Sequence, residues 1–73
     1  RKLTFKERHE LDALPGQIEG LEAEQARKSE ALNDPSLYNG PNDELLAITE
    51  RQAVLDAELL QAYARWEVLS ERA

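Results

Sequence analysis

The sequence predicts an all-α fold, an antiparallel two-stranded coiled-coil hairpin, and three observations lead to this prediction. Its 73 residues are 41% hydrophobic and 33% charged but only 5% aromatic, and Ala, Leu, Glu, Gln and Arg dominate, which is a helical composition. Apolar residues recur at alternating three- and four-residue steps along most of the chain, which is the spacing of a coiled-coil seam. Only residues 34–42 carry a sustained loop signal, so the chain is expected to fold back once.

The first helix is expected at about residues 5–14 of a single domain that comprises the whole chain. It begins with a capping box, in which the Thr4 hydroxyl accepts a hydrogen bond from the Glu7 amide and the Glu7 carboxylate accepts one from the Thr4 amide. Pro15 lacks an amide hydrogen and disfavours the helical conformation of the preceding residue. We therefore predict a short N-terminal helix that is kinked or broken at Pro15.

The second helix is expected at about residues 15–33 and the third at about residues 43–72, and the loop 34–42 joins them. The second helix ends before Asp34 because a residue that precedes a proline disfavours the helical conformation. Asn42 is a favourable N-cap for the third helix, and two carboxylates follow it in the first turn, where the helix dipole stabilises negative charge.

The apolar seam predicts the register of the two arms. Its residues are Leu11, Leu14, Ile18, Leu21, Gln25, Lys28 and Leu32 before the loop, and Leu45, Ile48, Gln52, Leu55, Leu59, Ala62, Trp66 and Leu69 after it. Folding at the loop brings Gln25 to Gln52, so both polar seam residues share one layer. It also brings Leu11 to Trp66, and we expect the Trp66 ring to pack there with Phe5 nearby. The hairpin is expected to be monomeric.

The sequence has no signature of an active site or a metal site. It has no Cys, one His and no Gly-rich phosphate loop, and a two-helix hairpin offers no cavity for a substrate. We interpret His9 as a solvated surface residue, with a phosphate contact or a pH switch as the alternative. We therefore predict no catalytic residue, no cofactor and no metal ligand in this chain, and no contact with a membrane.

The open end of the hairpin carries a cluster of positive charge. Four cations and one carboxylate give the first nine residues a net charge of +3, and the other sixty-four carry −9 of the total of −6. Two arginines of the returning helix are expected near the same end. The candidate nucleic-acid-binding residues are these six cations, Arg1, Lys2, Lys6, Arg8, Arg65 and Arg72. A junction with a neighbouring domain is the alternative interpretation, and spacing alone favours it.

Several segments of the chain share the motifs of one family. The chain opens with Lys2-Leu3-Thr4-Phe5-Lys6-Glu7, followed by Glu10-Leu11 and Leu14-Pro15. It continues with Ile18-Glu19, Leu21-Glu22 and Glu24, with Leu32, Asp34-Pro35 and Tyr38 in the turn, and with Arg65-Trp66 and Leu69 near the end. Together these segments resemble the C-terminal domain of Uup-type ABC-F ATPases, and the resemblance covers nearly the whole chain.

The resemblance implies a place in a larger protein. ABC-F proteins are cytoplasmic, carry two ATP-binding cassettes in tandem without a transmembrane domain, and act on ribosomes. The C-terminal coiled coil of the Uup branch is regarded as a DNA-binding appendage. The missing initiator Met agrees with a piece of a longer cytosolic protein that binds ATP upstream of these residues.

Two functions follow as expectations from the resemblance and the charge pattern. The first is a C-terminal appendage that binds DNA or structured RNA through phosphate contacts, without reading the bases. The alternative is a protein-interaction arm that docks on the ATPase cassettes or on a ribosomal protein. The net charge of −6 favours the alternative, and the resemblance and the clustered cations favour the first.

Overall fold

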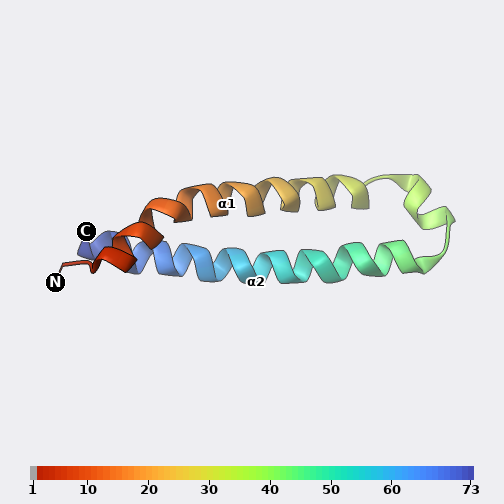
Figure 1. Cartoon of the computed structure of the whole chain (residues 1–73). Coiled ribbons are helices and arrows are strands. Elements are labelled where there is room, and N and C mark those ends of the chain that lie inside the picture. Colours follow the sequence, from red (N-terminus) through yellow and green to blue (C-terminus); the bar gives the residue numbers. More distant parts are fainter. Residues whose placement is uncertain (1) are drawn as a thin grey trace.

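The structure is a hairpin of two long helices (Figure 1). It is a computed structural model that describes residues 2–73. Helix α1 spans Phe5–Leu32, a short 3₁₀ helix, η1, spans Pro35–Asn39, and helix α2 spans Asn42–Arg72. The two long helices lie antiparallel, with the start of α1 and the end of α2 at the open end, and the molecule measures 55 × 16 × 15 Å. The predicted all-α helical hairpin is confirmed.

Helix α1 continues through Pro15 instead of ending there. The helices expected at 5–14 and 15–33 are therefore one element, and the prediction of a break is wrong. The direction of α1 does change, because its first turns, red in Figure 1, run obliquely across the end of α2 before the helix turns parallel to it. A proline inside a helix loses one hydrogen bond and crowds the preceding turn, which bends the helix. Leu14, directly before Pro15, is buried in the core.

The two long helices begin in different ways. Thr4 and Glu7 form the predicted capping box, with hydrogen bonds of 2.9 and 3.1 Å. The cap predicted at Asn42 is wrong, because α2 begins at Asn42 itself and Pro41 precedes it without a side-chain hydrogen bond. The fixed φ of a proline suits the extended conformation that Pro41 adopts, so the helix starts without help from the asparagine side chain.

The loop is ordered by hydrogen bonds of its own side chains. Asp34 caps η1 by accepting hydrogen bonds from the amide and the hydroxyl of Ser36, at 3.0 and 2.9 Å. The Tyr38 hydroxyl donates to the Leu32 carbonyl at 2.6 Å, which satisfies an acceptor that the end of α1 leaves free. These contacts turn the chain back toward α2 with little apolar burial.

The core is the seam between α1 and α2, and it is thin. Within residues 2–73 the buried apolar residues are Leu14, Leu55, Leu59 and Leu69. The other seam residues, apart from Trp66, are half-buried as predicted: Leu11, Ile18, Leu21, Gln25, Lys28 and Leu32 on α1, and Leu45, Ile48, Gln52 and Ala62 on α2. No helix in the described part of the chain has an apolar stretch that could cross a membrane.

Trp66 lies outside the core, so its predicted packing against the start of α1 is wrong. Trp66 is 45% exposed and Phe5 is 86% exposed, and neither ring closes the core. Leu69 is buried at this end, between the half-buried Arg65 and Arg72. The contact face of α2 therefore turns away from Trp66 toward the arginine side. The bend of α1 explains this change, because it leads the first turns of α1 obliquely across α2 (Figure 1).

Gln25 and Gln52 lie in the interface as expected, but each forms its hydrogen bond with another residue. The Gln25 side-chain amide donates to Asp56 at 2.7 Å, and the Gln52 amide donates to Ser29 at 2.9 Å. Each amide thus reaches the residue one turn beyond the other glutamine on the facing helix. The polar layer therefore joins the two helices through a pair of hydrogen bonds that solvent can reach.

Two adjacent leucines on α2 provide a matched test of the seam. Leu59 is 4% exposed and Leu60 is 72% exposed. Leu59→Ala is expected to lower the free energy of unfolding by about 2–5 kcal/mol, because it removes buried methyl groups and leaves a cavity. Leu60→Ala is expected to change it by less than about 0.5 kcal/mol. Urea unfolding followed by circular dichroism measures both values, and similar losses for the two variants would contradict the observed register.

The polar layer gives a second prediction about stability. Changing both Gln25 and Gln52 to Leu is expected to raise the melting temperature, because apolar contact replaces partly exposed hydrogen bonds that contribute about 1 kcal/mol each. The double variant is also expected to populate other registers or oligomers, since a polar seam residue specifies the pairing. Thermal unfolding and size-exclusion chromatography measure the two effects. A monomeric double variant that melts at a lower temperature would contradict this account of the layer.

Candidate nucleic-acid interface

Three of the six predicted cations are exposed at the open end. Lys2 precedes α1, and Lys6 and Arg8 lie on its first turns. None of the three forms an ion pair with any residue between positions 2 and 73. Arg1, which was predicted to join them, lies outside the described residues. The start of α1 thus presents positive charge that the fold itself does not use.

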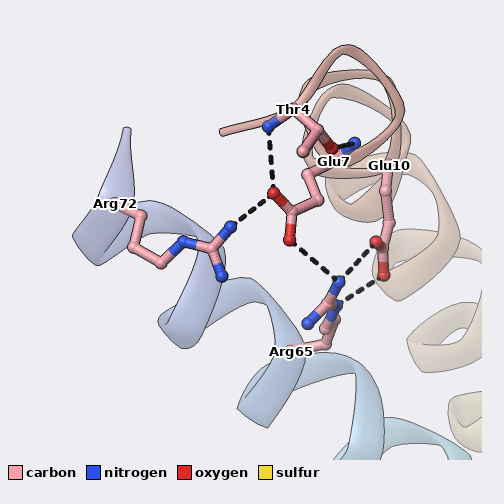
Figure 2. Close-up of polar contacts among 5 residues, drawn as sticks. All are labelled: Thr4, Glu7, Glu10, Arg65 and Arg72. Atoms are coloured by element: carbon pink, nitrogen blue, oxygen red, sulfur yellow. Dashed lines mark hydrogen bonds and ion pairs between the residues drawn. The ribbon is translucent and has the colours of Figure 1, made fainter. Parts of the chain in front are cut away.

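Arg65 and Arg72 reach the same end from α2, but carboxylates of α1 hold both of them (Figure 2). Arg65 binds Glu10 with two hydrogen bonds, Nε to Oε2 at 2.7 Å and Nη2 to Oε1 at 2.9 Å. Arg72 donates from Nη2 to Oε1 of Glu7. The structure therefore brings five predicted cations to one end, and it pairs two of them inside the hairpin.

Glu7 lies at the centre of this network (Figure 2). Its Oε1 accepts hydrogen bonds from the Thr4 amide and from Arg72, and its Oε2 lies 4.0 Å from Nη2 of Arg65. The hydrogen bond from the Thr4 backbone, followed by that from Arg72, lowers the pKa of Glu7 from 4.5 to about 2. The hydrogen bond from Arg65 likewise lowers the pKa of Glu10. Glu7 therefore remains ionised, and the network persists, well into the acidic range.

Glu7 and Glu10 are interface residues that the apolar pattern does not reveal. Both continue the three- and four-residue steps of Leu14 toward the N-terminus, so they face α2 as the seam leucines do. Arg65 and Arg72 occupy the facing positions of α2. Opposite charges beside the predicted seam, on the two arms of the hairpin, were the available signal. Ion pairs thus close the open end of the hairpin where apolar side chains were expected.

Phe5 and His9 add aromatic surface to the exposed cations. Phe5 is 86% exposed, and His9 is exposed too, in agreement with its interpretation as a surface residue. The two ring centroids lie 6.5 Å apart with an interplanar angle of 44°, one turn from each other on α1. The start of α1 therefore offers both positive charge and open ring faces to a partner.

Comparison with known proteins decides the family of this domain. Residues 2–71 match the family model described as the ABC transporter C-terminal domain. The chain belongs to this family. It is 34% identical over 68 residues to the ATP-binding protein Uup of Escherichia coli (strain K12), an alignment that covers 93% of the chain and 11% of the relative. The resemblance to Uup-type C-terminal domains that the motifs indicate is confirmed.

Relatives from Haemophilus influenzae (strain ATCC 51907 / DSM 11121 / KW20 / Rd) agree with this assignment. The ATP-binding proteins Uup-like and Uup of this organism are each 35% identical to the domain over 71 residues, or 97% of the chain. These alignments cover 16% and 11% of the two relatives, so the chain corresponds to a small part of their length. No solved structure shows significant similarity to the chain. The chain is thus a C-terminal domain of the type found in ABC transporter-like ATP-binding proteins.

The ion-pair network predicts how the stability of this C-terminal domain depends on pH. The pKa of Glu7 is about 2 in the fold against an ordinary 4.5, so the ionised carboxylate stabilises the fold above its ordinary pKa. This contribution is lost as the pH falls from about 5 to about 2. Glu7→Gln is therefore expected to melt at a lower temperature than the wild type at neutral pH. The difference is expected to shrink across the acidic window, and thermal unfolding by circular dichroism measures it.

Glu19→Gln is the control for this experiment, because Glu19 is exposed on α1 and forms no ion pair within the described residues. The control removes the same charge and is expected to melt close to the wild type at each pH. A Glu7→Gln variant that differs from the wild type equally at all pH values would contradict the assigned role of the Glu7 carboxylate.

Proposed function

We propose that this domain binds nucleic acid, DNA or structured RNA, through phosphate contacts at its open end, as an appendage of a Uup-like ATP-binding protein. The main support for this proposal is that Lys2, Lys6 and Arg8 are exposed and form no ion pair with any residue in the described range 2–73. Lysine and arginine bind phosphates and release the counterions around them, which supplies affinity without sequence information. Arg1 adds a fourth positive charge in the sequence.

Arg65 and Arg72 support this interface through the carboxylates that they bind. Unpaired, Glu7 and Glu10 would repel phosphates close to the cations. Ion pairs with the two arginines offset the negative charge of both carboxylates. The paired arginines therefore keep the potential at the start of α1 positive and contribute to binding from the returning helix.

The charge distribution limits how strongly the domain binds. Outside the first nine residues the chain carries a net charge of −9, which repels a polyanion along most of the rod. Three or four phosphate contacts give a slope of about −3 for the logarithm of affinity for duplex DNA against the logarithm of salt concentration. Sequence preference is slight, because no helix presents a set of side chains to base edges. Binding is thus weak, dependent on salt and confined to one end.

A second candidate function is a protein-interaction arm that docks on the ATPase cassettes or on a ribosomal protein. Leu46, Leu60 and Val68 of α2 are 56%, 72% and 46% exposed, and they offer apolar surface that the hairpin does not cover. The net charge of −6 also suits a basic protein better than a polyanion. This candidate places the contact on α2 and away from the first turns of α1.

A pair of double variants with equal charge tests the proposed function. Lys6→Gln with Arg8→Gln removes two exposed cations from the open end, and Arg27→Gln with Lys28→Gln removes two from the other half of α1, where no ion pair holds them among residues 2–73. The first variant is expected to lose most of its affinity for duplex DNA, and its salt slope is expected to fall by about 2. Fluorescence anisotropy at two salt concentrations measures both quantities.

The second double variant is the control for net charge, and it is expected to retain most of the affinity and the full salt slope. Equal losses in the two variants would mean that overall charge governs binding, which would overturn the proposed interface. Amide shift changes on adding DNA that centre on residues 34–42 or on α2 would also overturn it, and would leave the interaction arm as the better account.

A further inference from the structure

Phe5 and His9 occupy the side of α1 that faces away from α2. The buried Leu14 marks the inner side of the helix, and at 3.6 residues per turn Phe5 falls about 180° from it and His9 about 140° from it. Lys6 and Arg8 lie on opposite sides of Phe5, at about 100° one way and about 60° the other. The aromatic pair therefore stands in open solvent between two exposed cations.

The hairpin does not need the Phe5 ring for its own stability. The ring is 86% exposed, and its aromatic neighbour is His9, which is itself exposed. The start of α1 is held by the capping box of Thr4 and by the hydrogen bond that Arg72 donates to Glu7, and neither uses the ring. A large aromatic side chain exposed to this extent presents most of its surface to a partner.

The charges around the ring indicate what kind of partner it fits. A surface that combines open aromatic faces with Lys and Arg matches single-stranded nucleic acid, whose bases stack on rings while its phosphates bind the cations. A fully paired duplex hides its base faces inside the stack and offers only phosphates and groove edges to such a surface. The two ring centroids lie 6.5 Å apart, so bases of one strand can reach both rings.

We propose that Phe5, together with His9, is a stacking platform for unpaired bases, and that the open end therefore prefers single-stranded to fully paired nucleic acid. This inference rests on the proposed function, because Lys2, Lys6 and Arg8 supply the phosphate contacts that hold the strand beside the rings. It assigns the two aromatic residues to ligand selection, and the cations to affinity for both forms.

Phe5→Ala in the 73-residue chain tests the platform against two probes, a single-stranded oligothymidylate and a duplex of mixed sequence, by fluorescence anisotropy at low salt. The wild type is expected to bind the single strand more tightly than the duplex, although the duplex carries the higher density of phosphate charge. Phe5→Ala is expected to weaken single-strand binding by about five- to 150-fold, the range for loss of one stacked base, and to leave duplex binding nearly unchanged. Circular dichroism confirms that each variant is helical.

Three variants define the controls. Phe5→Leu keeps the apolar bulk without an aromatic face and is expected to behave like Phe5→Ala, whereas Phe5→Tyr keeps the face and is expected to bind like the wild type. Leu60→Ala removes another strongly exposed apolar side chain, this one from α2, and it is expected to change binding to neither probe. Full binding of the single strand by Phe5→Leu would mean that apolar bulk is sufficient, and would overturn the stacking platform.

The outcomes separate this inference from the proposed function. Loss of single-strand binding alone in Phe5→Ala supports the platform. Unchanged binding of both probes by Phe5→Ala, while Lys6→Gln with Arg8→Gln loses both, would leave the phosphate interface standing and overturn the platform. Failure of the wild type to bind either probe would overturn both.

An optical measurement gives a second test that does not depend on affinity alone. Trp66→Phe with Phe5→Trp moves the single tryptophan of the chain to the proposed platform. Stacking of a base on that indole is expected to quench its emission on addition of oligothymidylate, and the duplex is expected to quench it far less. Equal quenching by the two probes would contradict the platform.

Discussion

Each helix of the hairpin can bury its apolar stripe only against the other helix, and this mutual dependence governs the rest of the structure. The buried apolar residues of the described chain are all leucines, Leu14, Leu55, Leu59 and Leu69. Such a small core leaves both ends of the rod to be closed by polar contacts. At the loop end, the Tyr38 hydroxyl donates a hydrogen bond to the Leu32 carbonyl. At the open end, Glu7 and Glu10 accept hydrogen bonds from the arginines of α2. An exposed ion pair contributes about 1 kcal/mol or less to the free energy of unfolding, so these pairs stabilise the open end mainly as a network.

The bend at Pro15 links the packing of the hairpin to the chemistry of its surface. It carries the first turns of α1 across α2 (Figure 1). The contact face of α2 there consists of Arg65, Leu69 and Arg72. Trp66 loses its place in the core as a consequence. The carboxylates of α1 then meet arginines where a straight seam would have brought apolar residues together. The exposed cations and Phe5 occupy the remaining sides of the same turns.

The open end thus separates two groups of charges that lie close together. Inward-facing Glu7 and Glu10 are balanced by Arg72 and Arg65, whereas the outward-facing lysines and Arg8 have no partner within residues 2–73. An acidic rod can in this way present positive charge at the start of α1, because Glu7 and Glu10 are each paired with an arginine of α2. The same arrangement explains why net charge alone, at −6, is a poor guide to what this domain can bind. The curated relatives that the chain matches are several times its length.

The sequence by itself determined the helical class, the single turn at the loop, the antiparallel register away from the open end and the capping box at Thr4, because each depends on spacing or on neighbours along the chain. It also located the cluster of exposed cations at the start of α1. Only the tertiary structure decided that α1 stays continuous through Pro15, that Trp66 is exposed, and which arginines are paired. These features depend on how far one helix bends across the other, and the apolar spacing is equally consistent with a straight seam. The direction of that crossing sets which side chains of α2 meet the carboxylates of α1, and spacing along one chain carries no information about it.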